Sequence, residues 1–85
     1  MKTFQWTMQD KLGLHARVAG ELVKCVAAGT SRVTLEKAGK TADASRLFAV
    51  VALCVRQGEV VTVTVEGPNE DADCAALQEF CEKNF

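Results

Sequence analysis

Apolar and polar residues alternate in three stretches of the chain, a period of two that is typical of half-buried strands. These stretches cover residues 4–9, 32–36 and 60–66, and the last is rich in valine and threonine. Residues 37–40 are expected to form a turn and residues 41–43 a short return strand, which together with the second stretch make a hairpin.

Three segments between and after these strands have helical spacing instead. From Ala16 onward, apolar residues recur at i, i+3, i+4 and i+7, and Gly29 follows as a C-terminal glycine. Ser45 is expected to cap a short, almost wholly apolar helix over residues 46–53, and Asn69 to cap a last helix. The apolar stripes are Ala19, Leu22, Val23 and Val26 in the first helix and Leu77, Phe80 and Cys81 in the last.

The predicted order is strand, helix, strand, strand, helix, strand, helix. Three helices on one face of a four-stranded, mainly antiparallel sheet make an α+β open-faced β-sandwich of order βαββαβα. The chain has 85 residues, which is enough for one core but not for two, so a single domain over residues 1–85 is expected.

Composition excludes several classes of protein. Hydrophobic residues make up 48% and charged residues 25%, as in a globular domain, and the net charge of −1 argues against nucleic acid as the main partner. No apolar run approaches the roughly 20 residues of a membrane span, and the N-terminus does not resemble a signal peptide. We therefore expect a cytoplasmic, monomeric protein without membrane insertion.

The four cysteines do not indicate a metal centre or a disulfide framework. They form no C-x-x-C pair, and a single histidine is available to join them, so no zinc site or cofactor is expected. Disulfides are not expected either in a chain with this apolar content and no export signal. We expect Cys25, Cys54, Cys74 and Cys81 to act as buried free thiols.

The strongest chemical candidate is His15, the only histidine in the chain. It lies between Gly13 and Arg17, and the first helical pattern begins directly after it. Backbone N–H groups at a helix N-terminus lack partners and the helix dipole is positive there, so the position suits an anion. A phosphoryl group carried by His15 itself would meet this requirement; the alternative is an ordinary surface histidine.

The segment Gly13-Leu14-His15-Ala16-Arg17 resembles the active-site motif of the HPr family, the histidine-containing phosphocarriers of the bacterial phosphoenolpyruvate:sugar phosphotransferase system. The similarity extends over essentially the whole chain. Residues 33–40 resemble the family's hairpin, residues 57–67 its fourth strand, and residues 79–84 its last helix.

The resemblance implies a role for each matching residue. His15 would accept a phosphoryl group on Nδ1 from phosphorylated Enzyme I and pass it to sugar-specific IIA domains, as a stoichiometric carrier rather than an enzyme. The backbone N–H groups of Ala16 and Arg17, with the Arg17 guanidinium, would hold the phosphoryl oxygens. A helix N-terminus disfavours imidazolium, which keeps the histidine a nucleophile. The matching partner-docking positions are Gly20, Lys24, Leu47, Phe48 and Val51, with Phe48 as the expected hot spot.

Three departures from the family pattern qualify these roles. Val18 replaces a proline that fixes φ in the first helical turn, so a less rigid phosphate site is expected. Arg46 stands where Gram-positive members have a regulatory serine, and with Ser45 only adjacent we expect no regulatory phosphoserine. Cys54 and Ala49 stand where glycines are common in the family.

A second function therefore stays open beside the sugar phosphocarrier. The chain could be an HPr-like regulatory binding module with weak or no phosphotransfer, or a carrier of a specialised branch such as the nitrogen-related system. Retention of His15 and Arg17 favours the carrier, whereas the loss of the proline and of the serine favours the binding module.

Overall fold

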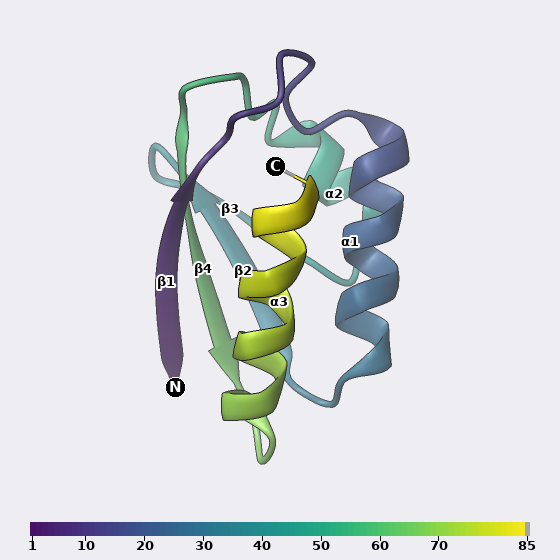
Figure 1. Cartoon of the computed structure of the whole chain (residues 1–85), viewed down its shortest axis with the longest axis vertical. Helices are drawn as coiled ribbons and strands as arrows, with labels where there is room; N and C mark the ends of the chain where they lie inside the picture. The colour runs from purple at the N-terminus through teal and green to yellow at the C-terminus, as the bar shows by residue number, and fades with distance from the viewer. Residues whose placement is uncertain (85) are drawn as a thin grey trace.

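Four strands form one antiparallel sheet that runs along the long axis of the molecule (Figure 1). The computed structural model describes residues 1–84. The sheet order is β1-β4-β2-β3, so that β4 lies between β1 and β2 and the hairpin strand β3 forms an edge. The strands are β1 (Lys2–Thr7), β2 (Arg32–Lys37), β3 (Lys40–Asp43) and β4 (Val60–Glu66).

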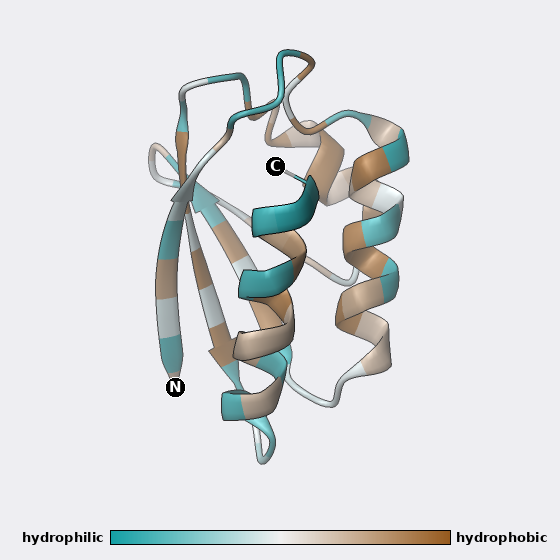
Figure 2. Ribbon diagram, in the orientation of Figure 1, coloured by the Kyte–Doolittle hydropathy of each residue, from teal (hydrophilic) through white to brown (hydrophobic). Residues whose placement is uncertain are grey.

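Alternation along the strands decides which face of the sheet is covered. In β4, Val61, Val63 and Val65 are buried, whereas the threonines between them are only half-buried. Val63 lies opposite Phe4 of β1 and Leu35 of β2, so apolar side chains line up across three strands on one face. Figure 2 shows this alternation along β4 as brown bands separated by pale ones.

Three helices cover the apolar face, and the other face of the sheet stays open. They are α1 (Ala16–Ala28), α2 (Leu47–Ala52) and α3 (Glu70–Asn84). Helix α1 packs beside both α2 and α3, and α3 also contacts β1 and β4. This arrangement confirms the predicted open-faced sandwich and its element order, and β4 begins and ends where the valine and threonine pattern predicted.

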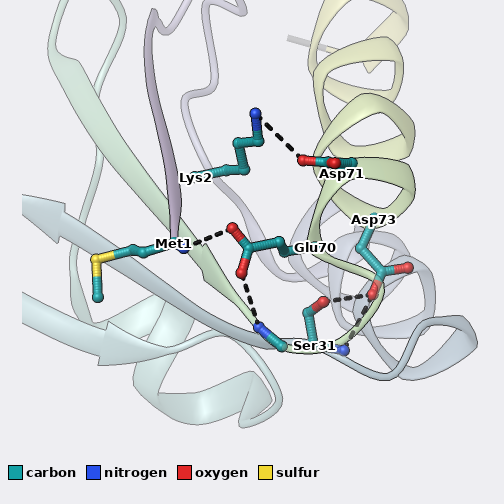
Figure 3. A network of polar contacts seen from close by, with 7 residues as sticks. Met1, Lys2, Ser31, Glu70, Asp71 and Asp73 are labelled. Atoms are coloured by element: carbon teal, nitrogen blue, oxygen red, sulfur yellow. Dashed lines mark hydrogen bonds and ion pairs between the residues drawn. The ribbon is translucent and has the colours of Figure 1, made fainter.

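The first turn of α3 fixes that helix to neighbouring segments through three carboxylates (Figure 3). Glu70 pairs with the N-terminal ammonium of Met1, and Asp71 pairs with Lys2. Asp73 accepts hydrogen bonds from the backbone N–H and the hydroxyl of Ser31, in the turn between α1 and β2. These donors lower the pKa of the Asp73 carboxyl, since they favour its ionised form.

Gly29 ends α1, but for a different reason from the one predicted. Its φ of −98° is extended rather than left-handed, so the usual argument for a C-terminal glycine does not apply. A Cβ on Gly29 would lie 2.5 Å from a carboxylate oxygen of Asp73. A larger residue would therefore displace the Asp73 carboxylate from its hydrogen bonds to residues 30 and 31, which favours glycine at this position.

No helix within residues 1–84 combines the length and the apolar character that crossing a bilayer would require.

Candidate functional site

His15 lies at the N-terminus of α1, where the loop after β1 turns into the helix (Figure 1). Its backbone is extended (φ −87°, ψ 170°) and its carbonyl accepts the N–H of Ala19, which makes it the N-cap residue. The His15 side chain makes no capping hydrogen bond. The N–H groups of Ala16 and Arg17 therefore point out of the helix end without an intrahelical acceptor, as the anion-site hypothesis requires.

The imidazole ring of His15 is half-buried, and its two nitrogens differ. Nε2 is buried and has no hydrogen-bond partner within residues 1–84. A phosphoryl donor cannot approach a nitrogen that is covered by protein. The burial of Nε2 favours Nδ1 as the nitrogen that an incoming group would meet, which is the nitrogen that the family resemblance implies.

The loop that carries His15 is shaped by its own hydrogen bonds. Asp10 accepts the Leu12 N–H with its carboxylate (2.9 Å) and the Gly13 N–H with its carbonyl (3.0 Å). Gly13 has φ +66°, and a Cβ there would lie 2.2 Å from the carbonyl oxygen of Val55. That same oxygen accepts the Leu14 N–H at 2.9 Å, so the residue before His15 is fixed to the segment after α2.

Arg17 and Lys24 supply exposed positive charge along α1 from the His15 end. Within the part of the chain that the structure describes, neither side chain forms an ion pair. Their charges are therefore available to an incoming anion or an acidic partner.

Val18 follows in the same first turn, and its side chain is buried with 4% exposure. The valine thus contributes to the core, a role that the sequence comparison with proline did not predict. Its effect on the rigidity of the phosphate site stays a prediction.

Helix α2 divides its side chains between the core and the surface. Val50 is fully buried and Leu53 nearly so, whereas Phe48 is 87% exposed, Leu47 lies at the surface and Val51 is half-buried. Figure 2 shows α2 in the colours of hydrophobic residues, beside the first turns of α1. The predicted docking residues on α1 and α2 thus belong to two helices that are in contact.

Leu12 is an exposed apolar residue near the site that the periodicity arguments missed. It is 75% exposed, in the loop three residues before His15. The sequence did contain an indication of this exposed residue. Leu12 is apolar, lies in a loop, and fits neither the helical nor the strand periodicity.

The predicted N-cap role of Ser45 is wrong. Arg46 occupies the N-cap position of α2, without a side-chain capping bond. Ser45 instead donates its N–H (2.9 Å) and its hydroxyl (2.7 Å) to the carboxylate of Asp43. A carboxylate two residues earlier competes for the same hydroxyl, and these donors lower the pKa of Asp43.

The four cysteines differ in burial, so the expectation of four buried thiols holds only in part. Cys74 and Cys81 are buried and Cys25 is half-buried, and burial raises the pKa of the Cys81 thiol to about 12. Cys54 is exposed and has φ +53°, a left-handed conformation that costs a non-glycine residue about 1 kcal/mol.

A half-buried histidine at a helix N-terminus, on an open-faced βαββαβα sandwich, is the arrangement that the resemblance to small histidine phosphocarriers predicts. A family model described as the PTS HPr component phosphorylation site matches residues 2–83. The chain belongs to the HPr family, whose members are phosphocarriers rather than catalysts.

Individual relatives agree with this assignment. The chain is 34% identical to the phosphocarrier protein HPr of Xylella fastidiosa (strain Temecula1), over 100% of this chain and 96% of that protein. An HPr structure from Thermoanaerobacter tengcongensis superimposes with a TM-score of 0.91 at 32% identity, covering 98% of this chain and 93% of that one. The chain is also 35% identical to the phosphoryl donor subunit DhaM of a PEP-dependent dihydroxyacetone kinase from Klebsiella michiganensis, over 92% of this chain but 16% of that protein.

Proposed function

We propose that the chain accepts a phosphoryl group on Nδ1 of His15 from phosphorylated Enzyme I and passes it to IIA domains during sugar uptake. The observation that carries this proposal is the placement of the ring. His15 is the N-cap residue of a helix whose first N–H groups lack acceptors, and the burial of Nε2 supports Nδ1 as the reactive nitrogen.

The transfer needs no group beyond those at the helix end. The Nδ1 lone pair attacks phosphorus while the bond from phosphorus to Enzyme I breaks and its electron pair returns to the donor. The N–H groups of Ala16 and Arg17, with the Arg17 guanidinium, receive the phosphoryl oxygens in charge-assisted hydrogen bonds. Transfer to a IIA domain repeats the same step with the roles of donor and acceptor exchanged, so the carrier is regenerated.

The docking surface for both partners comprises residues of the two helices that flank the site. Exposed Phe48 of α2 offers an aromatic anchor, and exposed Lys24 of α1 adds positive charge. The proposed surface consists of Gly20, Lys24, Leu47, Phe48 and Val51. We place this carrier in the cytoplasm as a monomer, where it would meet Enzyme I and IIA domains by diffusion.

A direct assay tests the carrier role. The chain is mixed with Enzyme I and labelled phosphoenolpyruvate, and acid-labile label is followed on the wild type and on His15→Ala. We expect label on the wild type alone. If the wild type stays unlabelled, or if His15→Ala keeps the label, the carrier role is wrong.

Serine-dependent regulation is not part of the proposed function. Arg46 carries a permanent positive charge at the N-cap of α2, and the Ser45 hydroxyl is bonded to Asp43. Incubation with HPr kinase and ATP should therefore leave the chain unlabelled. Label on Ser45, identified by mass spectrometry, would contradict this expectation.

The similarity to DhaM favours one second candidate, a carrier for a dedicated kinase system rather than for sugar uptake. The labelled chain can be offered to a IIA domain and, separately, to the remaining components of a dihydroxyacetone kinase system. Transfer to the IIA domain alone supports the first proposal, and transfer to the kinase system alone supports the second. A regulatory docking module would bind a partner and yet give no label in the Enzyme I assay.

A further inference from the structure

Lys37, the last residue of β2, is tied to the segment that follows α2. Its ammonium donates to the carbonyl oxygen of Cys54 at 2.8 Å and to the carboxylate of Glu59 at 3.0 Å. The Lys37 side chain is 15% exposed, and that of Glu59 38%. The lysine half of this pair is largely covered, and its additional bond to a backbone carbonyl distinguishes it from an isolated surface ion pair.

Glu59 lies at the other end of the segment after α2 and is hydrogen-bonded to Arg56 within that segment. Its carboxylate accepts the Arg56 N–H at 2.7 Å, and its own N–H donates to the Arg56 carbonyl at 3.1 Å. The donors from Arg56 and Lys37 lower the pKa of Glu59, so the carboxylate stays ionised at neutral pH. Lys37 and Glu59 thus connect the two ends of residues 54–59 to each other and to β2.

Residues 54–59 are hydrogen-bonded to the loop that precedes His15. The Val55 carbonyl accepts the Leu14 N–H, one residue before His15. At the start of the same loop, the Gly58 N–H donates to Met8 at 2.8 Å and the Gln57 amide donates to Gln9 at 3.2 Å. A displacement of residues 54–59 would therefore move Leu14 and, through the backbone, change how the His15 ring is presented at the N-terminus of α1.

The backbone of Cys54 favours such a displacement. Its left-handed backbone is disfavoured for a residue with a Cβ, and the chain could relax by turning the Cys54 peptide. The hydrogen bond from Lys37 to the Cys54 carbonyl opposes that rotation. Lys37 and Cys54 are 17 residues apart in the chain, so this support comes from the fold.

We propose that Lys37, together with Glu59, is a positioning residue for His15, because it fixes the 54–59 segment that holds Leu14 in place. The inference rests on the proposed role of His15 as phosphoryl acceptor. Neither side chain touches the phosphoryl group, and the pair acts through the Val55–Leu14 hydrogen bond.

The test uses phosphoramidate, a small donor that transfers a phosphoryl group to histidine and releases ammonia, so no partner protein is involved. The variants are Lys37→Met, Lys37→Arg and Glu59→Gln, and Lys40→Met is the matched control because Lys40 is an exposed lysine at the other end of the same turn. Urea unfolding of each variant separates a loss of folded protein from a loss of reactivity. The Leu14 and His15 amide signals in ¹H–¹⁵N spectra report the position of the loop.

We expect Lys37→Met and Glu59→Gln to be phosphorylated on His15 roughly tenfold more slowly while still folded, as a small misplacement of a reacting group produces. Their Leu14 and His15 signals should shift, whereas Lys37→Arg and Lys40→Met should react like the wild type. Wild-type rates in Lys37→Met, or a loss explained by its unfolded fraction, would overturn the proposal. So would a wild type that phosphoramidate does not label. A wild type that accepts phosphate from phosphoramidate but not from Enzyme I would refute the proposed function and leave this test valid.

Discussion

His15 is the N-cap residue of α1, a position that the local sequence determines. The burial of its ring nitrogen Nε2, by contrast, depends on the tertiary fold. The N-terminus of α1 supplies the free N–H groups of Ala16 and Arg17, which already favour an anion. A nearby cation would strengthen this anion site further. We propose Arg17 as that cation, because its side chain is exposed and forms no ion pair in the described chain.

Replacement of Arg17 by alanine should slow phosphoryl transfer to His15 by about 10- to 100-fold, since hydrogen bonds from a charged donor contribute roughly 1.5–3 kcal/mol. Stability should not change, because the side chain is exposed. The rate from Enzyme I is compared with that of Arg32→Ala, an exposed arginine beyond the far end of α1. Equal rates in both variants would exclude a phosphate role for Arg17.

At the level of single residues, the sequence predicted correctly those features that depend only on residues adjacent in the chain. The histidine, the glycine before it and the arginine after it form a local pattern, and the structure places them at the helix end as predicted. The roles of Gly29 and Ser45 were misjudged because Asp73 and Asp43 decide them. Asp73 lies more than forty residues away from its partners in the sequence, so no period or cap rule could reveal it.

Among the elements, the loop before α1 depends on the segment after α2 as well as on its own hydrogen bonds. Gly13 is the point of closest approach, because its missing Cβ leaves room for the Val55 carbonyl. The pair Lys37 and Glu59, separated by 22 residues, escaped sequence reasoning for the same reason as Asp73.

Gly13→Ala should lower the free energy of unfolding by more than about 2 kcal/mol, since it adds a backbone collision to the cost of a left-handed φ. Gly39→Ala is the matched control, because Gly39 has φ +84° but no atom within 4 Å of its Cβ position. We expect about 1 kcal/mol for the control in urea unfolding. A loss at Gly13 no larger than at Gly39 would mean that the loop moves freely away from Val55.

The proposed docking role of Phe48 in α2 leads to a separate prediction. Phe48→Ala should weaken binding of Enzyme I by roughly 10- to 100-fold, as the loss of an aromatic anchor does, and leave stability within about 0.5 kcal/mol. Val60→Ala is the comparison, because Val60 is also exposed but points to the open face of the sheet. If calorimetry gives the same affinity for both variants, the docking surface lies elsewhere.

In the molecule as a whole, the sheet and the helices were predictable because their hydrophobic periods are regular over five or more residues. The connections between them were less predictable, and carboxylates make several of these connections. Asp73 joins α3 to the turn before β2, and its lowered pKa couples this connection to pH.

The direction in which pH changes the stability follows from the lowered pKa of Asp73. A carboxyl whose pKa is lowered on folding stabilises the protein above its unfolded pKa of about 4, and this contribution disappears as the pH falls through the folded value. Asp73→Asn should therefore be less stable near pH 7, and its urea midpoint should fall less than that of the wild type between about pH 5 and pH 2. Ser31→Ala, which keeps the carboxylate and its backbone donors, should lie between the two. Parallel pH profiles for all three would show that Asp73 does not contribute.

The most direct test of the account is to identify the nitrogen that carries phosphorus. The chain is labelled with ¹⁵N in its single histidine, phosphorylated with Enzyme I and phosphoenolpyruvate, and the ring nitrogens are read by NMR spectroscopy. We predict coupling to phosphorus at Nδ1 of His15, with Nε2 still covered by the protein. An unchanged imidazole spectrum, or phosphorus on Nε2, would contradict the proposed function.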